Sequence, residues 1–348
     1  MKLRSRIIGP VIVYSRALPA VDEKLAMTNG WPTDTITSCL QSPCMKLHSN
    51  SVWLYVLFIV AATSLTVGCN PSPRPLDSFP VRKQTRYFDF RYERNSSQIE
   101  AMARFADGYI DLIDRDFIKT DFDYPIRVFV AKDQNRFEEF VHHELHVPGP
   151  AGFGLYMYSS KLVATYEDSG LGTFTHEAMH AFVETDLTHR PHWADEGIPT
   201  FFEKFYGYWK NDKLVLFWGF QNPWRIEALG AHLTRLNLPE ILSDQNPERD
   251  ESELRMVSLF LWEQGRFKRF LKFIADDDKR GYSSYFEAAM DLPLERMIPL
   301  WQKYLLDVER RRDAILALPL SAIFHNEEAF QSFAKLHSIS TEQVRQRD

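Results

Sequence analysis

One segment organises the rest of this chain: Thr173-Phe174-Thr175-His176-Glu177-Ala178-Met179-His180-Ala181-Phe182-Val183. On a helix, His176 and His180 lie one turn apart on the same face, so both imidazoles can reach a single metal ion. Glu177 lies about 100° further round the helix, so its side chain would lie beside the metal without binding it. A general base for a zinc-bound water has to occupy such a position. Apolar neighbours surround the helix almost completely, which predicts burial in a core.

A carboxylate follows at a spacing that can complete this site. After a break at Arg190-Pro191, a second predicted helix carries Glu196, 16 positions after His180. Two helices joined by a short loop can pack antiparallel and return this carboxylate to the histidine pair. Two imidazoles, one carboxylate and an open fourth position form the pattern of a catalytic zinc site.

The two segments together resemble a known family. His-Glu-Ala-Met-His at 176–180, followed by Pro-His-Trp-Ala-Asp-Glu-Gly at 191–197, is similar to the gluzincins, the thermolysin-like zinc peptidases. The likeness is strongest to the peptidase-MA-like group, in which a Trp-x-x-Glu-Gly segment supplies the third ligand. A metzincin would have Gly and His where this chain has Val183 and Asp186, so that class is excluded.

The resemblance assigns a role to each of these side chains. It implies hydrolysis of a peptide or protein substrate with Zn²⁺ as cofactor, the ligands His176, His180 and Glu196, and the catalytic base Glu177. The alternative is a lipoprotein that keeps the peptidase fold and binds metal or peptide without efficient hydrolysis. An intact Glu177 favours the enzyme, because a pure zinc binder needs no base there.

Other polar residues of the second helix have two or more possible roles. Glu203, seven residues after Glu196, returns to the same helix face, where it either orients a ligand histidine from behind or is a surface charge. Some gluzincins place an Asp four residues after the ligand Glu, but this chain has Thr200 there. Asp195 points elsewhere on the helix and is expected to be a cap or loop carboxylate.

The group that would stabilise the oxyanion is not evident. Gluzincins use a Tyr or His further along the chain, often at the start of the helix that here spans 251–256, where neither residue occurs. The available alternatives are Tyr206, Tyr208, Tyr282 and Tyr285.

A second histidine pair has helical spacing but lacks the rest of the motif. His142 and His146 lie one turn apart, yet the residue after the first is His143 and not a Glu, and a Pro-Gly turn follows at once. We interpret this pair as a solvated helix end.

The amino-terminal region has the features of a bacterial lipoprotein signal. Met45-Lys46 precedes the apolar run Val52–Val67, which ends on Gly68-Cys69. This run is shorter than the ~20 residues of a membrane-spanning helix and matches a secretory signal. The final pair resembles a lipobox, which implies lipidation of Cys69 and attachment to the cell-envelope membrane, facing the periplasm or the exterior. A plain signal peptide, an anchor helix and a cytoplasmic protein are the alternatives.

We therefore divide the chain into five parts. Residues 1–44 are an artefact of the assigned start codon or a long leader, residues 45–68 are the signal peptide, and residues 69–85 are a Pro-rich tether. The catalytic core is predicted at 86–207 and the helical lobe at 208–340. All three cysteines precede residue 70, so the core has no thiolate metal ligand.

Composition excludes one class of partner. The formal net charge is −6, and without residues 1–68 the chain keeps 35 basic and 44 acidic residues, a net charge of −9. Because no basic stripe is present, a nucleic-acid partner is not expected. Hydrophobic residues make up 45% of the chain and aromatic residues 14%, which is ample for a packed core.

The order of elements favours an α+β fold, with a small amino-terminal sheet and helices, then the histidine helix, then a mainly helical lobe. Alternation predicts strands at Tyr87–Tyr92 and Tyr124–Ala131, and a hairpin of Leu155–Tyr158 with Leu162–Tyr166. In gluzincins the strand before the zinc helix is an edge that binds substrate main chain by strand addition. The resemblance makes Leu162–Tyr166 the candidate, and an ordinary core strand is the alternative.

Helical periodicity covers most of the remaining chain. Helices are predicted at 96–118, 133–145, 224–236, 252–265, 267–276, 282–290, 294–316 and 326–336. Leu214–Trp218 is expected to be an inserted strand or a cleft wall, and Glu342–Asp348 a frayed tail.

Overall fold

The structure, a computed structural model, describes residues 79–94, 97–119, 125–149, 152–187, 190–243, 249–276 and 282–339. The predicted leader at 1–44, the signal peptide at 45–68, Cys69 and the tail at Glu342–Asp348 lie outside these residues. The predicted tether at 69–85 is too long, because Val81–Gln84 forms a strand. Within the described ranges, no helix is both long and apolar enough to span a bilayer.

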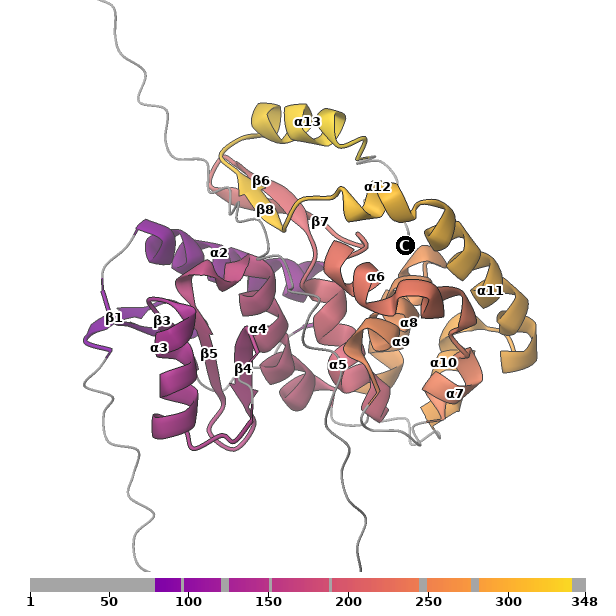
Figure 1. Cartoon of the computed structure of the whole chain (residues 1–348), viewed down its shortest axis with the longest axis horizontal. Coiled ribbons are helices and arrows are strands. Elements are labelled where there is room, and N and C mark those ends of the chain that lie inside the picture. The colour runs from indigo at the N-terminus through magenta and orange to yellow at the C-terminus, as the bar shows by residue number, and fades with distance from the viewer. Residues whose placement is uncertain are drawn as a thin grey trace, which may run out of the picture. The chain divides into compact units, whose positions relative to one another are not determined.

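A mixed sheet of five strands in the order β1-β2-β3-β5-β4 forms the first part of the fold (Figure 1). β2, β3 and β5 run parallel, while β1 and β4 pair antiparallel at the two edges. β5 is buried at every residue, as expected of a parallel strand covered on both faces. The strands are β1 (Val81–Gln84), β2 (Phe88–Tyr92), β3 (Ile126–Ala131), β4 (Gly154–Met157) and β5 (Leu162–Tyr166).

The predicted hairpin is confirmed, but the predicted edge strand is wrong. Leu162–Tyr166 pairs with β3 on one side and with β4 on the other, so its main-chain groups are already used. The turn at 158–161 folds β4 back against β5, so Gly154–Met157 forms this edge of the sheet and β1 forms the other. Alternating hydrophobicity identifies a strand, but it does not determine which neighbour lies beside it.

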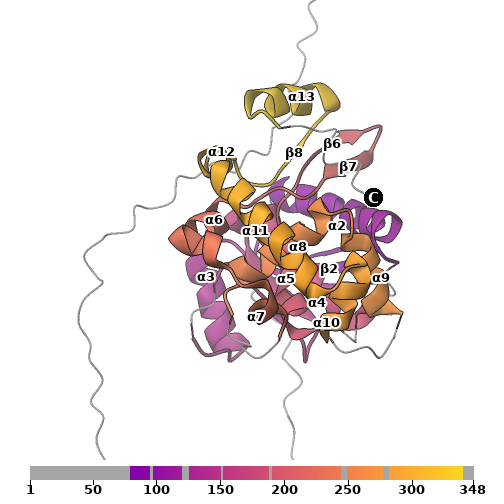
Figure 2. The same cartoon turned by 90° about the vertical axis from the view of Figure 1, so that its right-hand side faces the viewer.

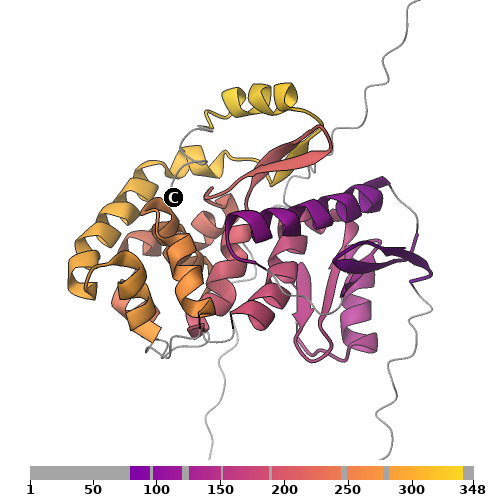
Figure 3. The same ribbon diagram turned by 180° about the vertical axis from the view of Figure 1, so that it is seen from behind.

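Helices cover both faces of this sheet. α2 (Ser97–Asp116) lies along one face (Figure 3), and α4 (Gly170–Asp186) packs on that face through Phe174, whose ring lies 5.6 Å from Phe88 and 5.9 Å from Phe90. α3 (Gln134–Glu139) and a π-helical turn at Phe140–Glu144 cover the other face. Successive strand residues therefore face opposite layers, as the period of two requires.

Two helices in the middle of the described unit connect the sheet to the later helices. α4 packs against β4 and β5 on one side and against α5 (His192–Phe202) on the other. α8 (Glu251–Glu263) packs closely on α5, since Ser258 Oγ donates a 2.6 Å hydrogen bond to Gly197 O. A Cβ at Gly197 would lie 3.1 Å from Leu254 O, so only glycine allows this approach without displacement.

The carboxy-terminal part is mainly helical, as predicted, but it also contains a second sheet in the order β7-β6-β8. β7 (Lys213–Phe217) confirms the inserted strand, whereas β6 (Tyr206–Lys210) and β8 (Ala322–Phe324) were not predicted. In Figure 2, α11 runs across the front of α8, where Trp301 packs edge-on against Phe260. The helices are α6 (Pro223–Leu229), α7 (Leu238–Leu242), α9 (Phe267–Ala275), α10 (Tyr282–Met290), α11 (Leu294–Arg310), α12 (Arg312–Leu316) and α13 (Glu327–Leu336).

The segment before β8 forms hydrogen bonds with the residues that follow α5. Pro319 O accepts hydrogen bonds from Lys204 Nζ and from Tyr206 Oη, the second at 2.7 Å. Ser321 Oγ donates to Glu203 O at 2.8 Å. A segment far away in the sequence thus fixes the position at which Glu203 lies, next to the histidine helix.

Candidate metal centre

The histidine helix is buried as its sequence predicts. α4 begins at Gly170, whose φ of 89° gives the backbone a left-handed entry that favours glycine. From Phe174 to Val183 every residue is buried, and His176 and His180 are 8% and 5% exposed. Because burial of an unpaired imidazole is costly, both rings require specific partners.

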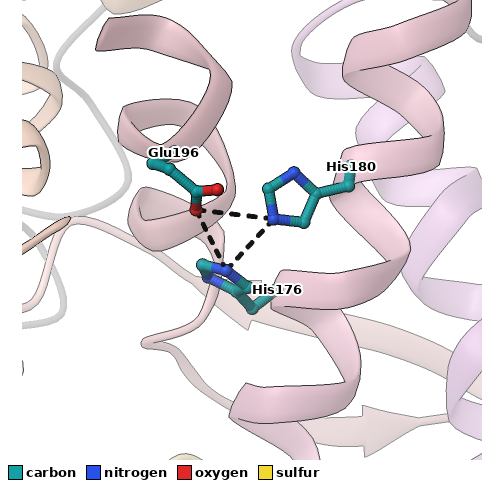
Figure 4. Close-up of side chains that lie close together, drawn as sticks. All are labelled: His176, His180 and Glu196. Atoms are coloured by element: carbon teal, nitrogen blue, oxygen red, sulfur yellow. Dashed lines mark hydrogen bonds and ion pairs between the residues drawn. The ribbon is translucent and has the colours of Figure 1, made fainter. Parts of the chain in front are cut away.

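His176, His180 and Glu196 form a compact group that could hold a metal ion. Figure 4 shows the two imidazoles from α4 and the carboxylate from α5 pointing toward one another. The two Nε2 atoms lie 3.2 Å apart, and Glu196 Oε2 lies 3.4 Å from His176 Nε2 and 3.5 Å from His180 Nε2. The Glu196 side chain is 33% exposed, so solvent can reach the group from that side.

Antiparallel packing of the two helices brings Glu196 to this position. α4 ends at Asp186, and Pro191 is the N-cap of α5. The helices approach closely at a second glycine, since a Cβ at Gly172 would lie 2.6 Å from Glu203 O. Gly172 lies one turn before His176, so this contact also places Glu203 behind the His176 ring.

Glu203 is buried and faces the other nitrogen of His176. Its Oε2 lies 3.4 Å from His176 Nδ1. Arg225 holds the carboxylate in a bidentate pair, with Nε and Nη2 donating at 2.6 and 2.7 Å. Asn222 Nδ2 donates a further bond at 2.8 Å, and Arg255 lies at 3.5 Å. The surface-charge alternative for Glu203 is therefore wrong, and the residue lies where a carboxylate can orient a ligand histidine.

Aromatic rings enclose His180. Tyr156 stacks on the imidazole with centroids 6.0 Å apart and an interplanar angle of 11°. Tyr158 packs edge-on at 6.1 Å, and its Oη lies 3.4 Å from His180 Nδ1. Partial burial, followed by the charges of Asp195 and Glu196, raises the pKa of Tyr158 to about 12, so its phenol stays neutral at physiological pH.

Glu177 is buried next to this group without belonging to it. The main chain of edge strand β4 passes directly over its side chain at Gly154. A Cβ at that position would lie 2.7 Å from Glu177 Cγ and 2.9 Å from its Oε1. Burial raises the pKa of Glu177, while the nearby histidines lower it less. A raised pKa suits a carboxylate that takes up and releases a proton near neutral pH.

The electrostatics of the group favour a cation. Burial lowers the pKa of His176, but the Glu196 and Glu203 carboxylates more than offset this effect and raise it to about 10. Burial raises the pKa of Glu196, but hydrogen bonds from His176 and His180 bring it well below its usual range. The carboxylates thus stabilise positive charge at the point where the ligand atoms converge.

Several other polar residues considered in the sequence do not reach this group. Thr200 Oγ1 donates to Gly197 O of its own helix at 3.0 Å, so its hydroxyl is not available to orient a histidine. Asp195 pairs with Arg190 and His192 at the start of α5, as expected of a cap or loop carboxylate. His142, His143 and His146 are exposed at the end of their helical segment, and His142 Nδ1 bonds to Val147 O at 2.9 Å.

The tyrosines considered for the oxyanion lie elsewhere. Tyr206 and Tyr208 are buried in the core of the second sheet, and Tyr285 is buried in the main core. The side chain of Tyr282 lies outside the described residues. In the part of the chain that the structure describes, none of these tyrosines therefore fills the role.

Sequence reasoning missed the residues that support the ligands. Arg225 and Asn222 lie at the start of α6, with no spacing relation to the histidine motif, and Tyr158 lies in a hairpin turn. Gly154 carried the clearest available signal, because an isolated glycine in a strand often marks a close approach of the backbone.

Comparison with known proteins does not assign the chain to a family. No protein-family model matches the chain, and no curated protein matches it. What the site can do therefore has to follow from its geometry and chemistry.

Proposed function

We propose that the protein is a zinc-dependent peptide hydrolase. One observation carries this proposal, the triangle of ligand atoms with sides of 3.2, 3.4 and 3.5 Å. A tetrahedral zinc ion with bonds of 2.0–2.1 Å separates its ligand atoms by about 3.3 Å. His176, His180 and Glu196 would hold Zn²⁺ and leave one position open, which is the ligand set of catalytic zinc sites.

Glu177 would act as the general base. When bound, Zn²⁺ acidifies a water molecule and polarises the scissile carbonyl. Glu177 takes a proton from the attacking water as the new C–O bond forms. It then gives this proton to the amide nitrogen as the C–N bond breaks, so the products are a carboxylic acid and an amine. Glu203, fixed by Arg225, keeps Nδ1 of His176 protonated and its Nε2 free for the metal.

The edge of the first sheet formed by β4 would bind the substrate main chain. β4 has no strand on its outer side among the described residues, and it packs directly against α4. An extended peptide can add to such an edge through main-chain hydrogen bonds. Because Gly154 touches Glu177, a peptide on this edge would run next to the base.

We also propose that residues 45–68 are a signal peptide and that a lipid on Cys69 attaches the protein to the bacterial cell envelope. Mass spectrometry of the membrane-extracted protein checks this directly. We expect a lipidated Cys69 as the first residue, and an unmodified Cys69 inside a longer chain would contradict the anchor.

The first test of the activity is a mixed peptide library incubated with the purified protein. We expect cleavage that stops on treatment with a chelator and returns when zinc is restored, because the base alone cannot activate water without the metal. Cleavage that is unaffected by the chelator would point to a different mechanism or to a contaminating peptidase.

The second candidate is a lipoprotein that binds metal or peptide without efficient hydrolysis. It is favoured by the burial of Tyr206, Tyr208 and Tyr285 away from the site, which leaves the oxyanion without an assigned partner. Such a protein would bind zinc but show no chelator-sensitive cleavage.

The contact between β4 and the base yields a mutational prediction. Gly154→Ala should displace Glu177 or push β4 outward, because its Cβ would lie 2.7 Å from both Glu177 Cγ and Thr173 Cγ2. A misplaced catalytic group costs on the order of 10²-fold in rate, so we expect kcat to fall by this factor with zinc retained. Gly108→Ala in α2 is the matched control. Wild-type kcat in Gly154→Ala would show that β4 does not fix the base.

A further inference from the structure

The ligand His180 needs a partner for its second ring nitrogen. Its Nε2 faces His176 and Glu196, so Nδ1 must carry the proton when Nε2 binds a metal. Ligand histidines nearly always donate this proton to an acceptor that fixes the ring and its tautomer. For His176, the carboxylate placed to take this role is Glu203, whose Oε2 lies 3.4 Å from Nδ1. In the described part of the chain, the acceptor within reach of His180 Nδ1 is Tyr158 Oη, at 3.4 Å.

We propose that Tyr158 is the positioning residue for His180, its hydroxyl oxygen accepting a hydrogen bond from Nδ1–H so that Nε2 stays free for the metal. This inference rests on the metal site of the proposed function. Tyr158 lies in the turn that directly follows edge strand β4. The two ligand histidines of α4 are thus contacted by two different segments, His176 by the end of α5 and His180 by the β4–β5 hairpin.

The geometry distinguishes this role from that of an oxyanion donor. The phenol contacts Nδ1, the nitrogen turned away from the other two ligands, so its oxygen lies behind the ligand ring. Tyr156 and His176 contact the same ring, with centroids at 6.0 and 4.9 Å, which restricts its rotation. A hydroxyl behind a confined ligand ring acts on the metal through the ring and not on the substrate.

Tyr158→Phe tests the proposal because it removes only the hydroxyl. We expect the zinc dissociation constant, measured by competition with a chromophoric chelator, to rise by ~10–100-fold, the usual effect of losing such a partner. The visible spectrum of the Co²⁺-substituted protein should shift as well. Tyr87→Phe is the matched control, since its hydroxyl bonds to Asp111 and Tyr87 does not belong to the ligand group. We expect its zinc affinity and spectrum to match the wild type.

Each outcome decides a separate question. Unchanged zinc affinity and Co²⁺ spectrum in Tyr158→Phe would overturn the positioning role. Unchanged affinity with a lower kcat would also overturn it, because the hydroxyl would then act on the substrate. If the wild-type protein binds no zinc, the metal site of the proposed function fails instead. The melting temperatures of both variants with chelator present should equal that of the wild type, which separates loss of the metal contact from loss of the fold.

Discussion

Glu177→Gln should lower peptide hydrolysis by ~10²–10⁴-fold, the usual contribution of a positioned base. Gln keeps the shape and volume of the side chain but cannot accept the proton of the attacking water. Because Glu177 lies outside the ligand group, zinc content and melting temperature should stay at the wild-type values. Peptide cleavage, elemental analysis and thermal unfolding on this one variant check all three expectations.

Glu184→Gln is the matched control, since it makes the same change on the same helix. Glu184 accepts a hydrogen bond from Tyr156 Oη and does not belong to the ligand group, so its rate should be near wild type. If Glu177→Gln changes neither cleavage nor zinc content, the proposed mechanism is wrong and the binding lipoprotein is favoured. Lost zinc or a lower melting temperature in Glu177→Gln would show that Glu177 is structural.

His180→Ala should reduce bound zinc from one ion per chain to nearly none. The change removes one of three protein ligands and leaves His176 and Glu196 with two open positions, which is too few ligands for a stable zinc site. The wild-type protein should lose thermal stability on chelation, because a ligand bound only to the native state stabilises it by mass action. The melting temperature of His180→Ala should not respond to the chelator.

His142→Ala is the control for this variant. His142 belongs to the second histidine pair, lies exposed, and bonds to Val147 O, so this protein should keep one zinc per chain. Full zinc occupancy in His180→Ala would contradict the ligand assignment. Loss of zinc in His142→Ala would indicate that the metal binds at the exposed histidines instead.

The sequence was most informative where spacing alone determines position. Helical periodicity places His176 and His180 on one face in any context, and a short connection leaves α4 and α5 few ways to pack. Together these two rules predicted that Glu196 lies next to the two histidines. The same rules predicted the hairpin and most helices, including a 294–316 helix that in the structure breaks at Arg311 into α11 and α12.

The sequence was least informative where distant segments meet. The edge strand was misassigned because pairing order depends on the whole sheet. Strand β8 escaped prediction because it pairs with β6 from far along the chain. For the same reason the pairing of Glu203 with Arg225 could not be read from spacing, although burial of a carboxylate requires some such partner.

The most direct test of zinc-dependent hydrolysis is a titration of the metal-free protein with Zn²⁺ while cleavage of a peptide is followed. If His176, His180 and Glu196 form a single catalytic site, the rate should rise linearly and level off at one zinc per chain, and His180→Ala should show no rise over this range. A protein that binds one zinc per chain while cleavage stays at the background rate throughout the titration would contradict the account.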